Sequence, residues 1–404
     1  MNELAAQHPL LTIVLPKVVI LLFVLLTALA YLTWFERKVV AHIQARWGPY
    51  RVGPHGLLQP LADGVKFLFK EDLTLPAADR VLYILSPFLA LSLAMTTLAL
   101  IPFGPATVYI FGQPTQLVVA NVDVGLLFLF AITSIGVYGV ALAGWSSNSK
   151  YSLLGGLRSS AQMISYEVSL TLSVVGVLLL AGSFNFNEII EHQQGYFRYL
   201  PFIPRWNVFP QIVGFLCYFV SAIAETNRAP FDLPEGETEL VGGFHTEYSS
   251  FKFAMFFMAE YGNMITVSCL ATILFFGGWL SPLPDSWTWQ QYLPGVGLLL
   301  AAFYLAYDTV RNMRGLGRIQ LAVVTLLAGG IGVLCLLPGV SPVILGPFWF
   351  LSKVFFIIFF YVWTRSTLPR MRYDQLMSFG WKLLLPVSLL NLVATALWIV
   401  VRHP

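Results

Sequence analysis

Long stretches of apolar side chains constrain this chain more than any other feature. Apolar residues make up 57% of its 404 residues and charged residues only 11%, and the mean hydropathy is +0.74. A helix of about 20 apolar residues is long enough to cross the hydrocarbon core of a bilayer. The sequence therefore predicts an all-α polytopic transmembrane bundle, with residues 1–404 forming a single membrane domain.

The apolar windows predict about ten spans. They lie near residues 10–35, 81–103, 121–145, 164–182, 209–224, 253–279, 294–310, 319–338, 347–364 and 381–401. With this number of spans, most basic loop residues fall on one side, and the other side keeps little beyond Arg198, Arg205 and Arg402. The positive-inside rule then places the basic side in the cytoplasm and both termini on the outer, periplasmic side.

Cysteine and histidine spacing gives no sign of a metal site. Cys217, Cys269 and Cys335 lie in separate apolar runs, and the six histidines form neither an HExxH motif nor an i, i+4 pair. The sequence also lacks a phosphate-binding loop and a dinucleotide fingerprint in a suitable context. We therefore expect neither a metal site nor nucleotide chemistry in this chain.

The first cytoplasmic segment, residues 36–80, is too long to be a simple connector. Between Gly56 and Glu71 apolar residues recur at helical spacing, while Asp63, Lys66 and Lys70 lie on other faces. This pattern predicts an amphipathic helix on the cytoplasmic surface of the membrane. A simple lipid anchor is the alternative.

An acidic cytoplasmic loop, residues 225–252, interrupts the apolar sequence. Pro230 and Pro234 prevent a continuous helix through it, and Arg228 is close enough to Glu225 to pair with it on the last helical turn. Crowded carboxylates beside a low-dielectric region can exchange protons near neutral pH. A solvated loop that docks a basic partner is the other interpretation. The acids of this loop are Glu225, Asp232, Glu235, Glu237, Glu239 and Glu247.

Three further acids lie in or beside predicted spans. Glu36 closes the first span, Glu167 lies at the start of the fourth, and Glu260 lies at or just inside the sixth. A carboxylate within a span is costly unless it faces an aqueous path or a partner. Snorkelling to the interface is the alternative, above all for Glu167. The basic residues Arg365, Arg370 and Arg372 either mark topology or pair with the acidic loop.

Several motifs together resemble one known family. They are WFERK at 34–38, GPYRVGP at 48–54, GLLQPLADGVK at 56–66, GWSSNSKYSLLG at 144–155, SYE at 165–167, ETNRAPFDLPEGETEL at 225–240, FMAEY at 257–261 and PRMRYDQ at 369–375. In this order they resemble the H subunit (also called subunit 1) of respiratory complex I, the proton-pumping NADH:quinone oxidoreductase.

The resemblance implies a multi-pass protein of the bacterial inner membrane that is not catalytic alone. Such a protein helps to form the quinone chamber and couples quinone reduction to proton translocation. Quinone would be its substrate, while NADH, FMN and the iron–sulfur clusters would bind to partner chains. Those partners would be the peripheral-arm quinone-site subunits and the small and antiporter-like membrane subunits, and no nucleic acid is implied.

The resemblance also implies two groups of site residues. Those expected to line or shape the quinone passage are Arg37, Asp63, Lys66, Phe67, Arg228 and Phe231. Those expected on the charged path from the chamber into the membrane are Glu36, Glu167, Glu225, Asp232, Glu235, Glu237, Glu239, Glu247, Glu260, Arg365, Arg370 and Arg372.

One part of the chain departs from the family pattern. Family members commonly have about eight spans, so residues 294–338 add a transmembrane hairpin, which leaves the topology unchanged. We expect this hairpin to face lipid or a partner, and Asp308 within it to be an interfacial charge.

Two other functions remain open from the sequence. The chain could be the equivalent subunit of a related membrane oxidoreductase that takes electrons from a reduced deazaflavin or ferredoxin. A stand-alone ion transporter would also explain acids within spans, although the sequence shows neither an internal repeat nor paired broken helices.

Overall fold

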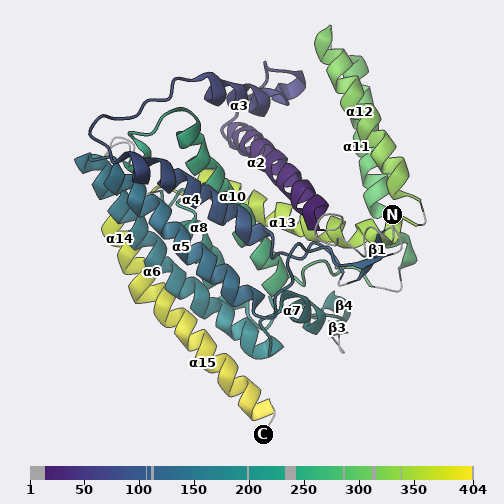
Figure 1. Cartoon of the computed structure of the whole chain (residues 1–404). Helices are drawn as coiled ribbons and strands as arrows, with labels where there is room; N and C mark the ends of the chain where they lie inside the picture. The colour runs from purple at the N-terminus through teal and green to yellow at the C-terminus, as the bar shows by residue number, and fades with distance from the viewer. Residues whose placement is uncertain are drawn as a thin grey trace.

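The computed structural model describes residues 14–105, 107–110, 113–197, 200–232, 243–284, 287–311, 315–337 and 339–402. Within them the regular secondary structure is helical apart from two short antiparallel strand pairs, so the all-α expectation is confirmed (Figure 1). The α-helices are α2 (Leu15–Ile43), α3 (Gln59–Phe69), α4 (Arg80–Leu98), α5 (Gly125–Ser146), α6 (Lys150–Ala181), α7 (Phe186–His192), α8 (Ile212–Glu225), α10 (Ser250–Phe275), α11 (Leu293–Arg311), α12 (Leu316–Cys335), α13 (Ser341–Thr367), α14 (Tyr373–Phe379) and α15 (Leu385–Arg402).

Short elements complete the chain. Three 3₁₀ turns, η2 (Pro54–Gly56), η3 (Gly243–His245) and η4 (Thr288–Tyr292), precede α3, α10 and α11. A π-helical turn, η5 (Gly380–Leu384), joins α14 to α15. Strand β1 (Val108–Ile110) pairs with β2 (Gln113–Thr115), and β3 (Tyr196–Phe197) pairs with β4 (Leu200–Pro204).

All ten predicted apolar windows coincide with helices. In the described part of the chain, nine helices are long and apolar enough to cross a membrane, and α8 is a shorter apolar helix. The largest error in the predicted boundaries is at α6, which begins at Lys150 rather than near residue 164. Its first turns contain serine, glycine and charged residues, which lower the hydropathy without ending the helix.

Close packing explains the glycines in that first part of α6. A Cβ atom on Gly155 would lie 2.8 Å from the backbone of Gly243, and one on Gly156 would lie 3.1 Å from the Cα of Gly144 in α5. Small residues let helix backbones approach in this way. The early start of α6 also moves Glu167 from the predicted beginning of a span to the middle of a long helix.

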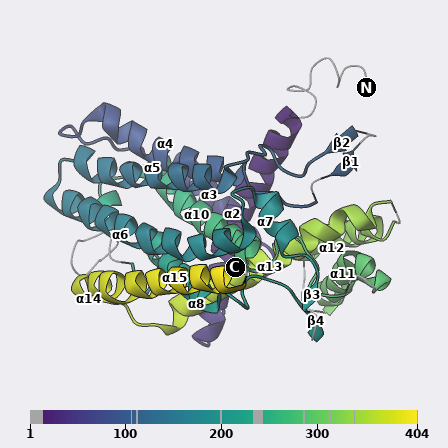
Figure 2. The ribbon, with the colours of Figure 1, turned by 90° about the horizontal axis from the view of Figure 1, so that it is seen from below.

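Helix α10 lies at the centre of the core. In its most apolar 18-residue window 78% of residues are buried, compared with 17% for α2, so most sides of α10 contact other helices. It packs against α4, α8 and α13, while α6 packs against α5, α8 and α15. Figure 2 shows this group from below, with α10 among the surrounding helices.

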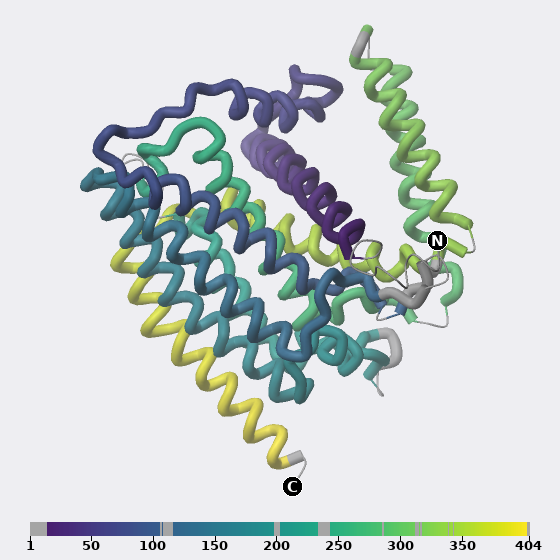
Figure 3. The backbone as a smooth tube through the Cα atoms, viewed as in Figure 1, coloured from purple at the N-terminus to yellow at the C-terminus, as the bar shows by residue number. Residues whose placement is uncertain are grey.

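The hairpin of α11 and α12 stands at one edge of the molecule in both views (Figures 1 and 2). Its helices pack mainly against each other, with smaller contacts from α11 to α13 and from α12 to η2. The expected amphipathic helix is α3, which has no fully buried residue. Figure 3 follows the backbone from the end of α2 through α3 and across to α4.

Candidate functional site

An apolar cavity of about 270 Å³ lies between α2, α3 and α10. Apolar and aromatic side chains form most of its wall, among them Phe67 of α3 and Phe257 of α10. A polar pair also lines the cavity, since Arg37 Nη1 lies 2.8 Å from Asp63 Oδ2. A pocket that is mostly apolar but has a few fixed polar groups suits a hydrophobic ligand with a polar head.

Tyr261 connects this cavity to a buried cluster of charges. Its side chain lines the cavity, and the guanidinium carbon of Arg228 lies 4.2 Å from the centroid of its ring. Arg228 is only 7% exposed and lies three residues after the end of α8 at Glu225. A cation over an aromatic ring is stabilised by the ring quadrupole, which is one reason this arginine can be buried.

Arg228 lies between two carboxylates from different helices. Its Nη1 is 3.8 Å from Glu36 Oε1 of α2, and its Nη2 is 3.7 Å from Glu260 Oε2 of α10. Arg365 of α13 also contacts Glu36 Oε1. Three of these groups, Arg228, Glu36 and Glu260, are largely removed from water, while Arg365 is partly exposed. Burying charges costs more than their attraction readily returns, so a cluster of this kind points to function rather than stability.

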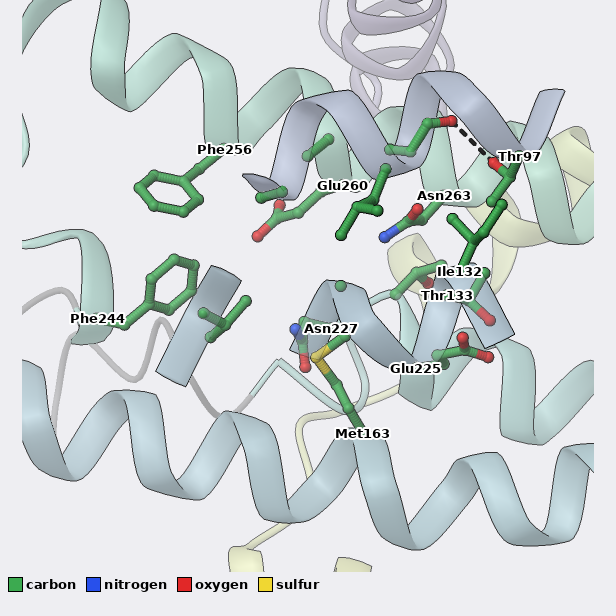
Figure 4. Close-up of a pocket in the computed structure, with 17 residues that line it drawn as sticks. Thr97, Ile132, Thr133, Met163, Glu225, Asn227, Phe244, Phe256, Glu260 and Asn263 are labelled. Atoms are coloured by element: carbon green, nitrogen blue, oxygen red, sulfur yellow. Dashed lines mark hydrogen bonds between the residues drawn. The ribbon is translucent and has the colours of Figure 1, made fainter. Parts of the chain in front are cut away.

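A second, narrower cavity begins on the other side of Glu260. Its volume is about 30 Å³, enough to hold one or two water molecules. In Figure 4 Asn263 and Thr133 lie between Glu260 and Glu225, and Asn227 lies nearby. Two of its buried oxygens, Glu225 Oε2 and Asn227 Oδ1, have no hydrogen-bond partner among the described residues. Such atoms are sites where ordered water binds.

Glu167 does not line the narrow cavity but lies near enough to Glu225 to interact with it electrostatically. Its carboxylate accepts a hydrogen bond from Ser134 of α5, so α5 and α6 share a polar contact within their apolar packing. The side chain is half-buried in the middle of α6 rather than at a helix end. This position removes the reason for expecting it to snorkel to the interface.

Comparisons with known proteins show the family of this chain. The pattern of the NADH dehydrogenase family matches residues 16–396. The chain is 49% identical over 385 residues to H subunit 1 of the NADH-quinone oxidoreductase of Solibacter usitatus, covering 94% of this chain and 95% of that protein. It is 50% identical over 403 residues to H subunit 2 of the same enzyme in Koribacter versatilis, covering 97% of this chain and 98% of that protein. The chain belongs to the family of NADH-quinone oxidoreductase H subunits.

Membership of the H-subunit family confirms the resemblance seen in the motifs. The chain is a multi-pass membrane subunit of complex I, an enzyme assembled from several subunits. Among the described residues no group of three or more histidine, cysteine, aspartate or glutamate side chains is placed to hold a metal ion.

The structure brings only some of the expected quinone-passage residues together. Arg37, Asp63 and Phe67 line the apolar cavity, and Arg228 lies directly behind Tyr261. Lys66 is exposed on α3 and does not line the cavity. Phe231 is buried elsewhere.

Phe231 belongs to the packing that supports the start of the acidic loop. Its ring centroid is 5.9 Å from that of Tyr166, and its carbonyl accepts a 2.8 Å hydrogen bond from the buried amide of Gln162. Arg370 donates to the backbone carbonyl of Asp232, so this arginine contacts the loop through its main chain. Glu235, Glu237 and Glu239 lie outside the described residues, and Arg372 is exposed at the start of α14.

The returning end of the loop is fixed by a pair of tyrosines. Tyr248 stacks on Tyr83 of α4 with 4.2 Å between ring centroids, and the Tyr83 hydroxyl donates to the Glu247 carbonyl at 2.6 Å. Burial raises the pKa of the Tyr248 phenol, and its hydroxyl makes hydrogen bonds with Ser86 and Ser146. Glu247 is thus held near α4 through its main chain.

Sequence reasoning missed Lys353, which lies in the apolar helix α13. Its ammonium donates to the carbonyls of Phe276, Gly278 and Leu280 at 2.7, 2.9 and 2.6 Å, and lies 4.3 Å from the ring centroid of Trp206. Lys353 therefore satisfies carbonyl groups just beyond the end of α10. The signal was a single lysine inside an apolar run, FWFLSKVFF, which the count of loop charges ignored.

Proposed function

We propose that this chain forms part of the quinone passage of complex I and carries the first steps of coupling between quinone reduction and proton movement. The observation that carries the proposal is a continuous series of contacts. The apolar cavity ends at Tyr261, Tyr261 stacks on Arg228, Arg228 lies between Glu36 and Glu260, and Glu260 lines the narrow cavity that leads to Glu225.

The apolar cavity is suited to a substrate with a long hydrophobic tail. Its wall accepts hydrocarbon, while Arg37, Asp63 and Tyr261 are the polar groups available to the head. Quinone reduction consumes protons, so the head needs donors or water close to the point where charge develops. Lys66 and Phe231, outside this cavity, are assigned to the approach and to support of the loop rather than to the wall.

The charge cluster could transmit the effect of quinone reduction from the apolar cavity to the acids within the membrane. A change of charge near Tyr261 alters the field at Arg228, which then interacts more strongly with one of its two carboxylates. Glu260 belongs to both the cluster and the narrow cavity, so its proton affinity responds to that change. Glu225, Glu167 and the acids of the loop would carry the response toward the pumping subunits.

The same proposal includes the surroundings of the chain. We assign it to the bacterial inner membrane with both termini periplasmic, bound to peripheral-arm subunits on the face of α3 and to other membrane subunits at its sides. NADH, FMN and iron–sulfur clusters belong to those partners. The relatives named NADH-quinone oxidoreductase favour this donor over a reduced deazaflavin or ferredoxin.

Photo-crosslinking of the assembled complex tests the passage. A quinone analogue with a photoreactive head should label peptides of 26–37, 60–67 and 251–261, and excess quinone should compete with that labelling. Labelling confined to other surfaces would overturn the assignment. Proton transport by the purified chain alone in liposomes would instead support a stand-alone transporter.

A further inference from the structure

The hairpin of α11 and α12 makes a specific contact with the surface segment that leads into α3. His55 Nε2 lies 2.6 Å from Asp308 Oδ2, although the two residues are 253 positions apart in the sequence. The Asp308 side chain is only 7% exposed, and it is the one acid in residues 293–337. Burying a carboxylate in an apolar helix costs free energy. An apolar side chain at position 308 would hold the hairpin in lipid without that cost, so the contact with His55 points to a further role for Asp308.

His55 joins three parts of the molecule. Its side chain contacts Asp308 of α11, and its carbonyl accepts a 3.3 Å hydrogen bond from Trp34 Nε1 of α2. Its ring packs edge-on against the ring of Tyr50, with 6.1 Å between the two ring centroids. A shift of α11 relative to α2 would therefore strain or break the contacts of His55.

The backbone around His55 is tightly specified. Gly53, His55 and Gly56 have φ values of +72°, +53° and +78°, a region that favours glycine. A Cβ atom on Gly56 would lie 2.5 Å from the Pro49 carbonyl oxygen, so the turn has no room for a side chain there. Because histidine adopts this backbone only at a cost, contacts of its side chain and carbonyl must help to hold it.

The turn passes this restraint directly to α3. The amides of Leu57 and Leu58 donate to the carbonyls of Pro54 and Val52, at 3.0 and 3.2 Å, and α3 begins at Gln59. Asp63 and Phe67 of α3 line the apolar cavity described above. Helix α3 has no fully buried residue, and Ser250 Oγ holds its C-terminal end through the carbonyls of Phe67 and Lys70, at 2.9 and 2.8 Å. The turn at His55 restrains the opposite, N-terminal end of α3.

We infer that the hairpin of α11 and α12 is a brace that positions α3 over the apolar cavity, with Asp308 and His55 as its positioning residues. The hairpin needs no part in the chemistry to do this. Its influence on quinone, unlike the brace itself, rests on the proposed function of the cavity.

Hydrogen exchange on the assembled complex tests the brace without reference to quinone. Asp308→Asn should speed amide exchange in residues 53–69 by up to about tenfold, because replacing the charged acceptor with a neutral amide oxygen weakens the hydrogen bond by about that factor in its equilibrium constant. The same acid-to-amide change at the exposed Asp123 should leave this segment unchanged. Unchanged exchange in Asp308→Asn would overturn the brace.

Exchanging the two side chains separates the contact from a general loss of folding. The double variant His55→Asp with Asp308→His restores an acid–imidazole pair, and aspartate tolerates the left-handed backbone at position 55. It should recover protection that His55→Asp alone loses. Failure of the double variant to recover, with the complex assembled, would also overturn the brace.

Quinone kinetics then distinguish the brace from the function of the cavity. The KM for a long-tailed quinone should rise several-fold in Asp308→Asn, while NADH oxidation by a hydrophilic artificial acceptor stays unchanged. Faster amide exchange in Asp308→Asn with an unchanged KM would support the brace and would overturn the assignment of the cavity next to α3 as a quinone passage.

Discussion

The Arg228 guanidinium lies over the ring of Tyr261, 4.2 Å from its centroid. The Tyr261 ring thereby separates the apolar cavity from the buried cluster of charges. Tyr261 faces the apolar cavity on one side and Arg228 on the other. Glu260, its neighbour along α10, contacts the cluster and also lines the narrow cavity. Two consecutive residues of one helix thereby link the apolar cavity to the narrow cavity that Glu225 also lines.

Replacing Tyr261 tests this link. In Tyr261→Leu we expect the KM for quinone to rise about tenfold, because a desolvated cation–π contact contributes about 1–2 kcal/mol to holding Arg228 in place. Tyr261→Phe keeps the ring and should show a much smaller change in KM. NADH oxidation with an artificial acceptor is the control for assembly. Equal kinetics in the two variants would show that the ring does not position Arg228.

Removing the charge of Glu225 tests the inner end of the path. Glu225→Gln keeps the shape of the side chain but cannot release a proton, so fewer protons should cross the membrane for each quinone reduced. The measurement is the proton-to-electron ratio in vesicles containing the complex. Glu188→Gln, an exposed acid of α7, is the matched control and should pump normally. A normal ratio in Glu225→Gln would exclude this residue from the path.

Lys353 tests whether the end of α10 depends on α13. Lys353→Met leaves three carbonyls without their charged donor, at a cost of about 1–3 kcal/mol for each unsatisfied group. We expect the assembled complex to lose activity at a temperature several degrees lower than the wild type. Lys382→Met, at an exposed lysine, should not shift that temperature. An unchanged midpoint in Lys353→Met would show that the carbonyls find other partners.

Hydropathy predicted the helices well because it measures the preference of side chains for an apolar environment over water, which is what places a helix in the bilayer. It failed at the start of α6, where packing against α5 and η3 selects glycine and serine instead of long apolar side chains. The motifs placed Arg37, Asp63 and Phe67 near one another, and the cavity contains all three. The spacing of residues in the sequence could not reveal the pairing of His55 with Asp308, because the two are 253 positions apart and the contact depends on the packing of the hairpin against η2.

The crossing of the two hairpin helices provides the last prediction, with a control on the same helix. A Cβ atom on Gly332 would lie 3.1 Å from Leu299 Cγ and 3.3 Å from the Gly295 carbonyl oxygen, whereas one on Gly330 meets nothing within 4 Å. Gly332→Ala should therefore destabilise the crossing by about 1–3 kcal/mol, while Gly330→Ala should be neutral or slightly stabilising.

Hydrogen exchange of the amides in α11 and α12 measures the difference. Faster exchange is expected in Gly332→Ala alone, and it should extend to residues 53–58, because the hairpin meets the surface segment at η2 and His55. Faster exchange confined to the hairpin would mean that its crossing and its contact with His55 are independent. Equal exchange in both variants would show that α11 and α12 do not depend on close approach at Gly332.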